Sequence, residues 1–389
     1  GQEAYLSVPD QLSQLFPNEQ PPYRITVMVV THCHKDHVGA LPKLVSEGVI
    51  DPEWALLTDP KLGFGRSQDD SDAVDLSDER TRKLAAALRE EDASDLTDSA
   101  LSEFMDAAAT VEAKYAAMLA DLEDKGVRIV RYRGQKLPPA LVAATRASGM
   151  QLLGPSQDQL GVAAGQISQT NKDATDAVHS ALAQDSALSD VALYRALSGS
   201  GLSDAGGGRG DAMNCQSITL AFGPRNARAL LAGDMQFAQP GVRGADAEVA
   251  ALRTAVAAAG PYKLFKTTHH TAHNGQDDDL LVVLGDPPII IHTGGSNDAS
   301  HPYPTTLQML TRRARSIVFA RTDRNGLITV EPHRAPEEAV TVSRGRINNF
   351  TDNASDVNVP APPAEVRVAA ARASTTGPQV IIVNLPAGS

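Results

Sequence analysis

The chain has 389 residues, of which 42% are hydrophobic, and a formal net charge of −12 at pH 7. This length is enough to bury a large core in one elaborated domain or in two, and the absence of any run of about 18 apolar residues excludes a membrane-spanning helix. The two cysteines, Cys33 and Cys215, do not make a disulfide framework, and no secretory leader pattern opens the sequence, so we expect a cytoplasmic protein.

The first predicted element is a strand over residues 24–30, a β-branched run typical of a buried strand. It leads directly into Thr31-His32-Cys33-His34-Lys35-Asp36-His37, and residues 38–44 then predict a loop that enters a helix. Strand, polar loop and helix in this order are the context that a metal-binding turn needs.

The polar loop has the pattern His-x-His-x-Asp-His, which places four coordinating side chains within six residues. We expect His32 and His34 to face one cation, and Asp36 and His37 to face a second. The alternative is a histidine-rich surface loop, or core histidines bonded to backbone groups, but the flanking strand and helix signals favour the metal site. Cys33 is expected to be a small filler without a ligand role.

An acidic segment follows a short predicted strand at 54–57. Residues 67–125 contain seventeen Asp or Glu and six Lys or Arg, a net −11, so the rest of the chain is close to neutral. Residues 77–92 and 98–124 show helical periodicity. We interpret this pair as a helical insertion at about 60–125 that covers the core or a protein partner, with a substrate lid as the alternative. Its apolar stripe is Leu84, Leu88, Leu101, Met105, Tyr115, Met118 and Leu122.

In the rest of the chain, strands alternate with helices, although several strands adjoin directly. This order favours an α/β sandwich with mixed sheets over a simple doubly wound fold. Residues 199–211 predict a flexible loop, at the end of an Ala/Gly-rich insertion at about 156–212. The other predicted strands cover 127–132, 150–153, 217–222, 227–231, 263–267, 288–292, 316–320, 327–331, 365–368 and 379–383, and the other predicted helices cover 139–148, 156–198, 244–258 and 303–314.

Two further polar motifs follow predicted strands. Gly233-Asp234 puts a carboxylate where it can bridge two cations, and the glycine allows a sharp backbone turn beside them; the alternative is a simple turn. His269 and His270 offer one more imidazole to the cation of Asp36 and His37. The sequence does not decide which of the two binds, and the other orients its neighbour or contacts substrate.

Three more polar positions lie near predicted strand ends. His273 is expected to be exposed or to support the ligands from behind. Ser300-His301-Pro302 and Thr322-Asp323-Arg324-Asn325-Gly326 are predicted loops, and the Asp-x-Asn-Gly part of the second, taken alone, predicts a hairpin turn.

Taken in order, these motifs resemble the metallo-β-lactamase superfamily, and within it the metallo-hydrolase domain of ComEC-type DNA-uptake proteins. The resemblance runs from about residue 24 to 331. The matching segments are His32 to His37, Asn214-Cys215-Gln216-Ser217, Gly233-Asp234, His269-His270-Thr271-Ala272, Ser300-His301-Pro302 and Thr322 to Gly326.

The chain departs from the family pattern in three ways. The usual third-motif histidine is missing, and Asp211 and Asn214 stand in that region, so we expect a weak site at His32 and His34 or one completed by an oxygen ligand. His-His-Thr-Ala replaces His-His-Gly-Ser. The opening β-hairpin is also missing, and we hypothesise that the C-terminal strand pair, 365–368 and 379–383, supplies it; the alternative is a peripheral hairpin.

The resemblance implies a four-layered αββα metallo-β-lactamase-like sandwich with an acidic helical insertion. Residues 1–352 would form this domain, interrupted by the insertions at about 60–125 and 156–212. Residues 353–389 would be a Pro/Ala-rich linker and the C-terminal strand pair, which would complete a core sheet.

The implied function is a metal-dependent hydrolase that holds two divalent cations, Zn or Mn, and attacks with a metal-bound hydroxide. We expect a phosphodiesterase or nuclease acting on DNA or another phosphodiester. The alternatives are a hydrolase of small esters, lactones or phosphorylated metabolites, and a degenerate metal-binding partner module in a larger assembly. A protein partner would dock on the acidic insertion.

The residues expected to act are few. The expected metal ligands are His32, His34, Asp36, His37, Asp234 and one of His269 and His270. Asp36 is also expected to be catalytic, and His301 or His273 to give a hydrogen bond or proton to the leaving group. Arginines outside the insertion favour a DNA substrate, whereas the lack of a basic patch with interleaved aromatic residues argues against it. These arginines are Arg128, Arg131, Arg133, Arg312, Arg313 and Arg315.

Overall fold

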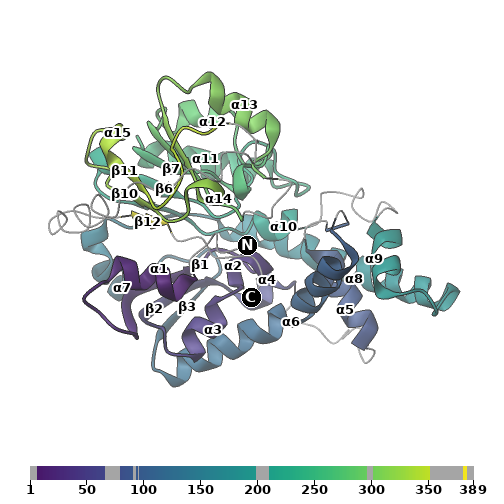
Figure 1. Ribbon diagram of the computed structural model, residues 1–389. Helices are drawn as coiled ribbons and strands as arrows, with labels where there is room; N and C mark the ends of the chain where they lie inside the picture. The colour runs from purple at the N-terminus through teal and green to yellow at the C-terminus, as the bar shows by residue number, and fades with distance from the viewer. Residues whose placement is uncertain are drawn as a thin grey trace.

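A computed structural model describes residues 7–65, 79–90, 93, 94, 96–198, 210–295, 301–350 and 380–382. The fold is mixed α/β, with two three-stranded sheets and one six-stranded sheet among these residues (Figure 1). Within the same part of the chain, no helix combines the length and apolar character that crossing a membrane requires.

The first sheet holds β1 (Tyr23–Val30), β2 (Ile50–Thr58) and β3 (Arg128–Tyr132), all parallel and in that order. The short helices α2 (Lys35–Val38) and α3 (Leu41–Ser46) connect β1 to β2. Both faces of β2 are buried, as expected for a parallel strand covered on two sides.

The six-stranded sheet runs in the order β4 (Gln151–Gly154), β5 (Thr219–Phe222), β6 (Ala229–Leu231), β7 (Leu264–Lys266), β8 (Ile289–His292) and β9 (Val318–Arg321). Strands β4 to β6 are antiparallel neighbours, and β6 to β9 are parallel. This confirms the prediction of a mixed sheet. Its parallel half places the carboxyl ends of β6, β7 and β8 along one edge, which is where loops can carry a site.

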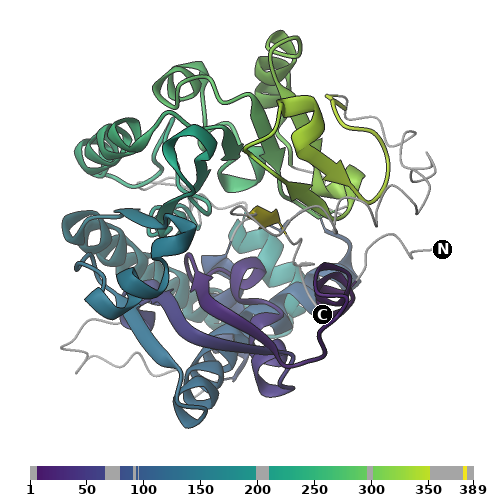
Figure 2. The same cartoon turned by 90° about the vertical axis from the view of Figure 1, so that its left-hand side faces the viewer.

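Apolar side chains join the first two sheets face to face. Trp54 and Leu56 of β2 share a buried cluster with Leu220 of β5, whereas Leu57, which points the other way, packs with Tyr115 on the long helix α6 (Asp98–Asp124). Helices α11 (Asp246–Ala259), α12 (Asp278–Val283) and α13 (Pro304–Arg312) cover the outer face of the six-stranded sheet (Figure 2). The sheets therefore lie inside and the helices outside.

The third sheet packs on the inner face of the six-stranded sheet, beside the first sheet and against β6 to β9. Its strand order is β11 (Val340–Val342), β10 (Ile328–Val330), β12 (Val380–Ile382). Strand β12 pairs antiparallel with β10, so this predicted C-terminal strand does join a sheet, beside β10. Its predicted partner at 365–368 lies outside the described residues, so the hypothesis of a replacement hairpin stays a prediction.

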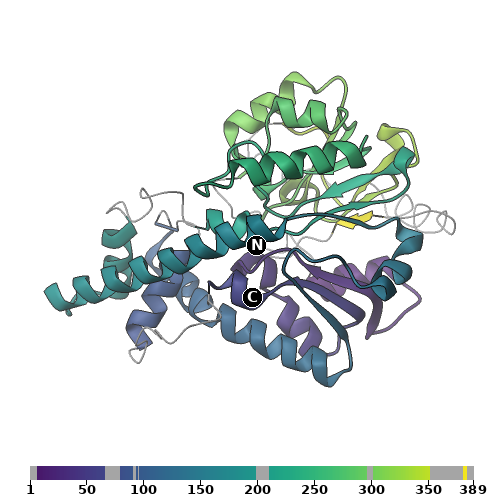
Figure 3. The same ribbon diagram turned by 180° about the vertical axis from the view of Figure 1, so that it is seen from behind.

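The helical segments combine into one lobe that projects beside the sheets (Figure 3). Helices α5 (Glu79–Arg89) and α6 carry the predicted apolar stripe, which is confirmed as buried, and α8 (Gln157–Gln184) and α9 (Asp190–Ser198) pack against them. The two predicted insertions thus share a core of their own, while the second half of α6 covers the first sheet. That core includes Leu84, Leu88, Leu101, Met105, Val178, Leu193 and Tyr194.

Short elements complete the fold, and one of them corrects an expectation. The Asp-x-Asn-Gly segment is not a hairpin turn: it forms α14 (Thr322–Asn325) between β9 and β10, which lie in different sheets. Most of the predicted loop at 199–211 lies outside the described residues. The remaining elements are α1 (Val8–Leu15), α4 (Pro60–Gly63), α7 (Pro139–Ala144), η1 (Arg146–Ser148), α10 (Asp211–Asn214), η2 (Arg225–Ala227), η3 (His269–Thr271) and α15 (Pro336–Ala339).

Candidate metal centre

Three loops meet at the carboxyl ends of parallel strands. The loop after β1 carries His32 to His37, the turn after β6 carries Asp234, and the turn after β7 carries His269 and His270. Because the first and second sheets pack face to face, loops separated by about two hundred residues reach the same point.

Four of the expected ligands form one compact cluster: Asp36, His37, Asp234 and His270, whose ligand atoms all lie within 4.8 Å of one another. His37 Nε2 lies 2.9 Å from Asp234 Oδ2 and 3.3 Å from Asp36 Oδ2. His270 Nε2 lies 2.9 Å from Asp36 Oδ2 and 3.1 Å from Asp234 Oδ2. Two imidazole nitrogens and two carboxylates converging on one point suit Zn or Mn, so the residues present fit a divalent cation.

The other two expected ligands, His32 and His34, lie next to this cluster. His32 Nε2 and His34 Nδ1 are 3.1 Å apart, and both side chains are buried. Asp234 Oδ2, which already faces His37 and His270, is also 4.0 Å from His32 Nε2. Asp234 therefore lies between the two groups, where a bridging carboxylate would be needed.

The structure distinguishes His269 from His270, whereas the sequence left open which of the two would face a cation. His270 joins the cluster, and its Nδ1 donates to the Thr293 carbonyl at 2.8 Å, which directs Nε2 to the carboxylates. His269 instead lies between two amides: its Nε2 is 3.1 Å from Asn214 Nδ2 and its Nδ1 is 2.7 Å from Asn274 Oδ1. We assign the proton of His269 to Nδ1 from these partners. His269 thus lies outside the four-residue cluster.

The turn that separates these two rings has an unusual backbone. His269, His270 and Thr271 have φ values of 46°, 45° and 66°, a left-handed region that costs a non-glycine residue roughly 1–3 kcal/mol. Buried hydroxyls hold the turn: Thr271 Oγ1 lies 2.7 Å from Thr267 Oγ1 and 2.8 Å from Nδ1 of the buried His292. Strain held in this way is typical of functional sites.

Hydroxyl groups behind the ligands fix their orientation. Ser217 Oγ accepts from the Asp234 backbone N–H at 2.9 Å and lies 3.1 Å from His32 Nδ1. Thr31 Oγ1 also lies 3.1 Å from His32 Nδ1. Gly233 has a φ of 53°, and a Cβ there would come within 2.8 Å of both the Ser217 and Thr31 hydroxyl oxygens. The expected role of this glycine in a sharp turn is therefore confirmed.

Without a cation, the cluster is held by ion pairs. Burial lowers the pKa of His37, but Asp234 and Asp36 raise it by more, to about 9. Burial raises the pKa of Asp234, but His270 and His37 lower it by more, so it lies well below its usual value. The same balance lowers the pKa of Asp36 and raises that of His270. Cation binding would displace the protons on both imidazoles, because a ligating imidazole must be neutral.

Two residues of this region were missed by the sequence analysis. Lys266, the last residue of β7, donates to the Gly233 carbonyl at 3.2 Å and lies 3.8 Å from Asp234 Oδ1. Burial lowers the pKa of this lysine, while Asp234 and Asp36 raise it. His292 ends β8 and supports Thr271. The available signal was the same for both: a polar residue at the carboxyl end of an apolar strand, next to the strands that carry ligands.

The remaining candidates lie around the cluster. The His301 ring centroid is 5.8 Å from that of His270 and 5.7 Å from that of His269, so His301 faces the site without joining it. His273 packs on Tyr303 with ring centroids 4.6 Å apart. Asp211 accepts a hydrogen bond from the side-chain amide of Gln236. Cys33 is fully buried and burial raises its pKa, as expected of a filler residue.

Comparison with known proteins adds nothing to this geometry. No family model matches the chain, and no curated protein is found to be similar to it.

Proposed function

We propose that this protein is a metal-dependent hydrolase that holds two divalent cations, Zn or Mn, and cleaves phosphodiester bonds. The observation that carries the proposal is the convergence of Asp36, His37, Asp234 and His270, from three loops, within 4.8 Å. Two inner sheets with helices on their outer faces support the four-layered αββα arrangement expected from the resemblance.

The residues divide into two groups around Asp234. Asp36, His37 and His270 would hold one cation, and His32 and His34 the other, with Asp234 shared between them. Bound cations of this kind lower the pKa of a coordinated water to about 7 and polarise the scissile group. The protein itself keeps the imidazoles oriented through the Thr293 carbonyl and the Ser217 hydroxyl.

His301 is the proposed donor to the leaving group. Its ring lies beside the rings of His270 and His269. A donor placed next to the ligands can give a hydrogen bond or a proton to the departing oxygen.

The choice of a phosphodiester rests on the metal site and not on a basic surface. Five of the six arginines named above pair with carboxylates: Arg128 with Glu53, Arg131 with Glu123, Arg133 with Asp59, and both Arg312 and Arg313 with Asp278. Paired arginines attract a nucleic-acid backbone less strongly than free ones, so a small phosphodiester is as good a first substrate as DNA.

The test combines metal content with cleavage. Purified protein, loaded with Mn or Zn, is assayed on bis(p-nitrophenyl) phosphate, on single- and double-stranded DNA, and on p-nitrophenyl acetate. The Asp36→Asn variant should lose phosphodiester cleavage by about 100-fold or more, as expected when a group that binds the catalytic metal is removed. His179→Ala, which changes an exposed histidine on α8, is the matched control and should keep full activity.

The other outcomes identify the alternatives. Cleavage of the acetate ester alone would favour a hydrolase of small esters or lactones. Tight binding of cations without any turnover would favour a metal-binding partner module. A protein that binds no cation would refute the proposal.

A further inference from the structure

One buried carboxylate of the helical insertion, that of Glu90, contacts the loop His32 to His37 that carries the expected ligands. Glu90 follows the last residue of α5, and its side chain is 6% exposed. Its Oε2 accepts a hydrogen bond of 3.4 Å from the backbone N–H of Lys35, a residue 55 positions earlier. Lys35 stands between His34 and Asp36, so this contact joins the insertion to the segment that carries four of the expected ligands.

One nitrogen of His34 is left without an acceptor. Nδ1 faces His32 Nε2 at 3.1 Å, which makes Nδ1 the atom directed at the site. Nε2 is buried and has no hydrogen-bond partner among the described residues. An imidazole that binds a cation through Nδ1 carries its proton on Nε2, and that N–H almost always donates to a carboxylate, a carbonyl or water.

The charge of His34 acts on the buried carboxyl group of Glu90. Burial raises the pKa of Glu90, and the first opposing influence is the charge of His34. The negative charge of Asp36, on the other side of Lys35, raises the pKa of Glu90 further. The contact that the geometry shows is the one with the Lys35 backbone, which lies between these two expected ligands.

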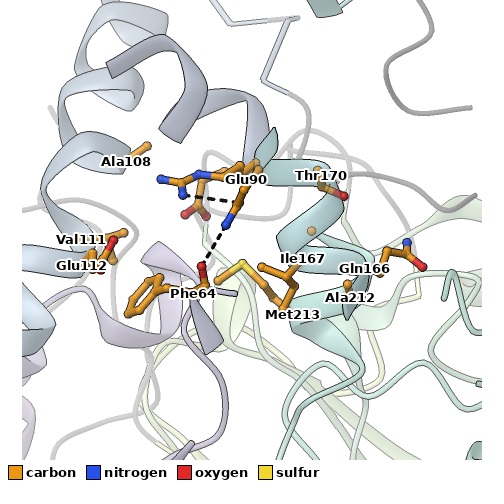
Figure 4. A pocket seen from close by; sticks show the side chains of 13 residues that line it. Phe64, Glu90, Ala108, Val111, Glu112, Gln166, Ile167, Thr170, Ala212 and Met213 are labelled. Carbon is orange, nitrogen blue, oxygen red and sulfur yellow. Dashed lines mark hydrogen bonds between the residues drawn. The ribbon is translucent and has the colours of Figure 1, made fainter. Parts of the chain in front are cut away.

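Other contacts hold this end of α5 and the loop in place. Arg89 donates to Asn171 Oδ1 at 3.4 Å, and Asn171 Nδ2 donates to the Phe64 carbonyl at 2.9 Å, which ties α5 to α8 and to the end of α4 (Figure 4). From the other side, the ammonium of Lys35 lies 4.4 Å from the centre of the Phe104 ring on α6. Lys35 is thus held by Glu90, which follows α5, and by Phe104 of α6.

The space behind Glu90 is too small for a substrate. Residues of α5, α6, α8 and α10 line a narrow pocket of about 30 Å³, and Glu90 lines it together with Glu112 and Met213 (Figure 4). This is room for roughly one or two water molecules. The small volume of this pocket therefore favours a role of Glu90 toward the ligand loop over a role in binding a substrate.

We propose that Glu90 is a positioning residue of the metal centre: its carboxylate holds the Lys35 N–H, and when His34 binds its cation the same carboxylate would accept from Nε2–H of His34 and so orient that imidazole. The helical insertion is then a working part of the metal centre and not a detachable lid. This inference rests on the proposed metal site, but it does not depend on the identity of the substrate.

The test measures cation binding by Glu90→Gln, which keeps an oxygen for Lys35 N–H but removes the charge. Zn and Mn titrations against a competing chelator report stoichiometry and affinity, and Co²⁺ absorption reports ligand geometry. We expect affinity at one of the two sites to fall about 10- to 100-fold, with the other site unchanged. The unfolding temperature of the cation-free protein should stay close to that of the wild type. Glu103→Gln, an exposed change on α6, is the control.

The outcomes separate this inference from the proposed function. Wild-type affinities and an unchanged Co²⁺ spectrum in both Glu90→Gln and Glu90→Ala would overturn the positioning role. A lowered unfolding temperature with both sites weakened equally would also overturn it, since that is the signature of a merely structural residue. If one site weakens selectively while the wild type cleaves no phosphodiester, the positioning role stands and the proposed substrate class fails.

Discussion

His37 Nε2 and Asp234 Oδ2 are 2.9 Å apart although 197 residues separate them in the chain. His37 belongs to the loop after β1, and Asp234 to the turn after β6 of a different sheet. The contact exists only because the two sheets pack face to face. It joins an imidazole whose pKa is raised to about 9 with a carboxyl whose pKa lies well below its usual value.

The raised pKa of His37 predicts that cation affinity increases with pH. Protonated His37 is paired with Asp234 in the cation-free protein, and a cation must displace that proton, so apparent affinity should rise from pH 6 to 8.5. Calorimetry in buffers of different ionisation enthalpy should show protons released on binding. An affinity that stays constant over this range would contradict the prediction.

The same pair predicts how the cation-free protein responds to pH. Because the folded pKa of His37 lies above the unfolded value of 6.5, its contribution to stability is fully present below pH 6.5 and is lost as pH rises through about 9. Asp36 and Asp234, whose pKa values are lowered, contribute above their unfolded pKa, and that contribution is lost in acid. Thermal unfolding with chelator should therefore show a lower unfolding temperature in both acid and alkali. His37→Gln should reduce the alkaline fall but not abolish it, because the pKa of His270 is raised by the same carboxylates.

The two adjacent histidines should behave differently when each is removed. His270→Ala takes one of four ligands from the compact cluster, and we expect its cation affinity to fall at least about 100-fold. His269→Ala removes a ring held by Asn214 and Asn274, and we expect cation content close to that of the wild type. Metal analysis after gel filtration measures the cation content of each variant. Loss of metal in His269→Ala with retention in His270→Ala would reverse the assignment.

Gly233→Ala should destabilise the protein and disturb Asp234. The new Cβ would lie 2.8 Å from the hydroxyl oxygens of Ser217 and Thr31 at a φ of 53°, and we expect a loss of about 2–4 kcal/mol from clash and strain together. Gly48→Ala is the matched control, because its φ is 67° but nothing lies within 4 Å of the added atom. Chemical denaturation measures the free energy of unfolding of both variants. Equal losses would mean that the close approach at Gly233 has no effect.

Ser217→Ala tests the hydroxyl behind the ligands. Its oxygen accepts from Asp234 N–H and lies 3.1 Å from His32 Nδ1, and the residue is fully buried. Leaving that buried N–H without its acceptor should cost about 1–3 kcal/mol, and cation affinity should fall about 10-fold or more. Ser13→Ala, on an exposed turn of α1, should change neither quantity. Unchanged affinity in Ser217→Ala would show that His32 is oriented by other groups.

Local pattern was enough to place most elements and the main ligand loop. The β-branched run at residues 24–30 predicted β1 as a buried strand, and the helical periodicity of the apolar residues in 98–124 predicted α6. His32 to His37 and Gly233-Asp234 were identified by the polar side chains that directly follow buried strands, where imidazoles and carboxylates can converge on a cation. The hairpin expected at Asp323 failed because the strands on either side belong to different sheets.

The candidate cation ligands could be predicted from the sequence, since imidazole and carboxylate chemistry and short spacing along one strand and loop are local properties. Which of these residues meet depends on how the sheets pack. Left-handed backbone at His269 and His270 turns one ring to the carboxylates and the other to Asn214. Lys266 lies 3.8 Å from Asp234 at a strand end, and Glu90, after a helix of the insertion, accepts from the backbone of Lys35 in the ligand loop. Such contacts join residues distant in the chain, and their geometry is set by how sheets and helices pack, which no local pattern encodes.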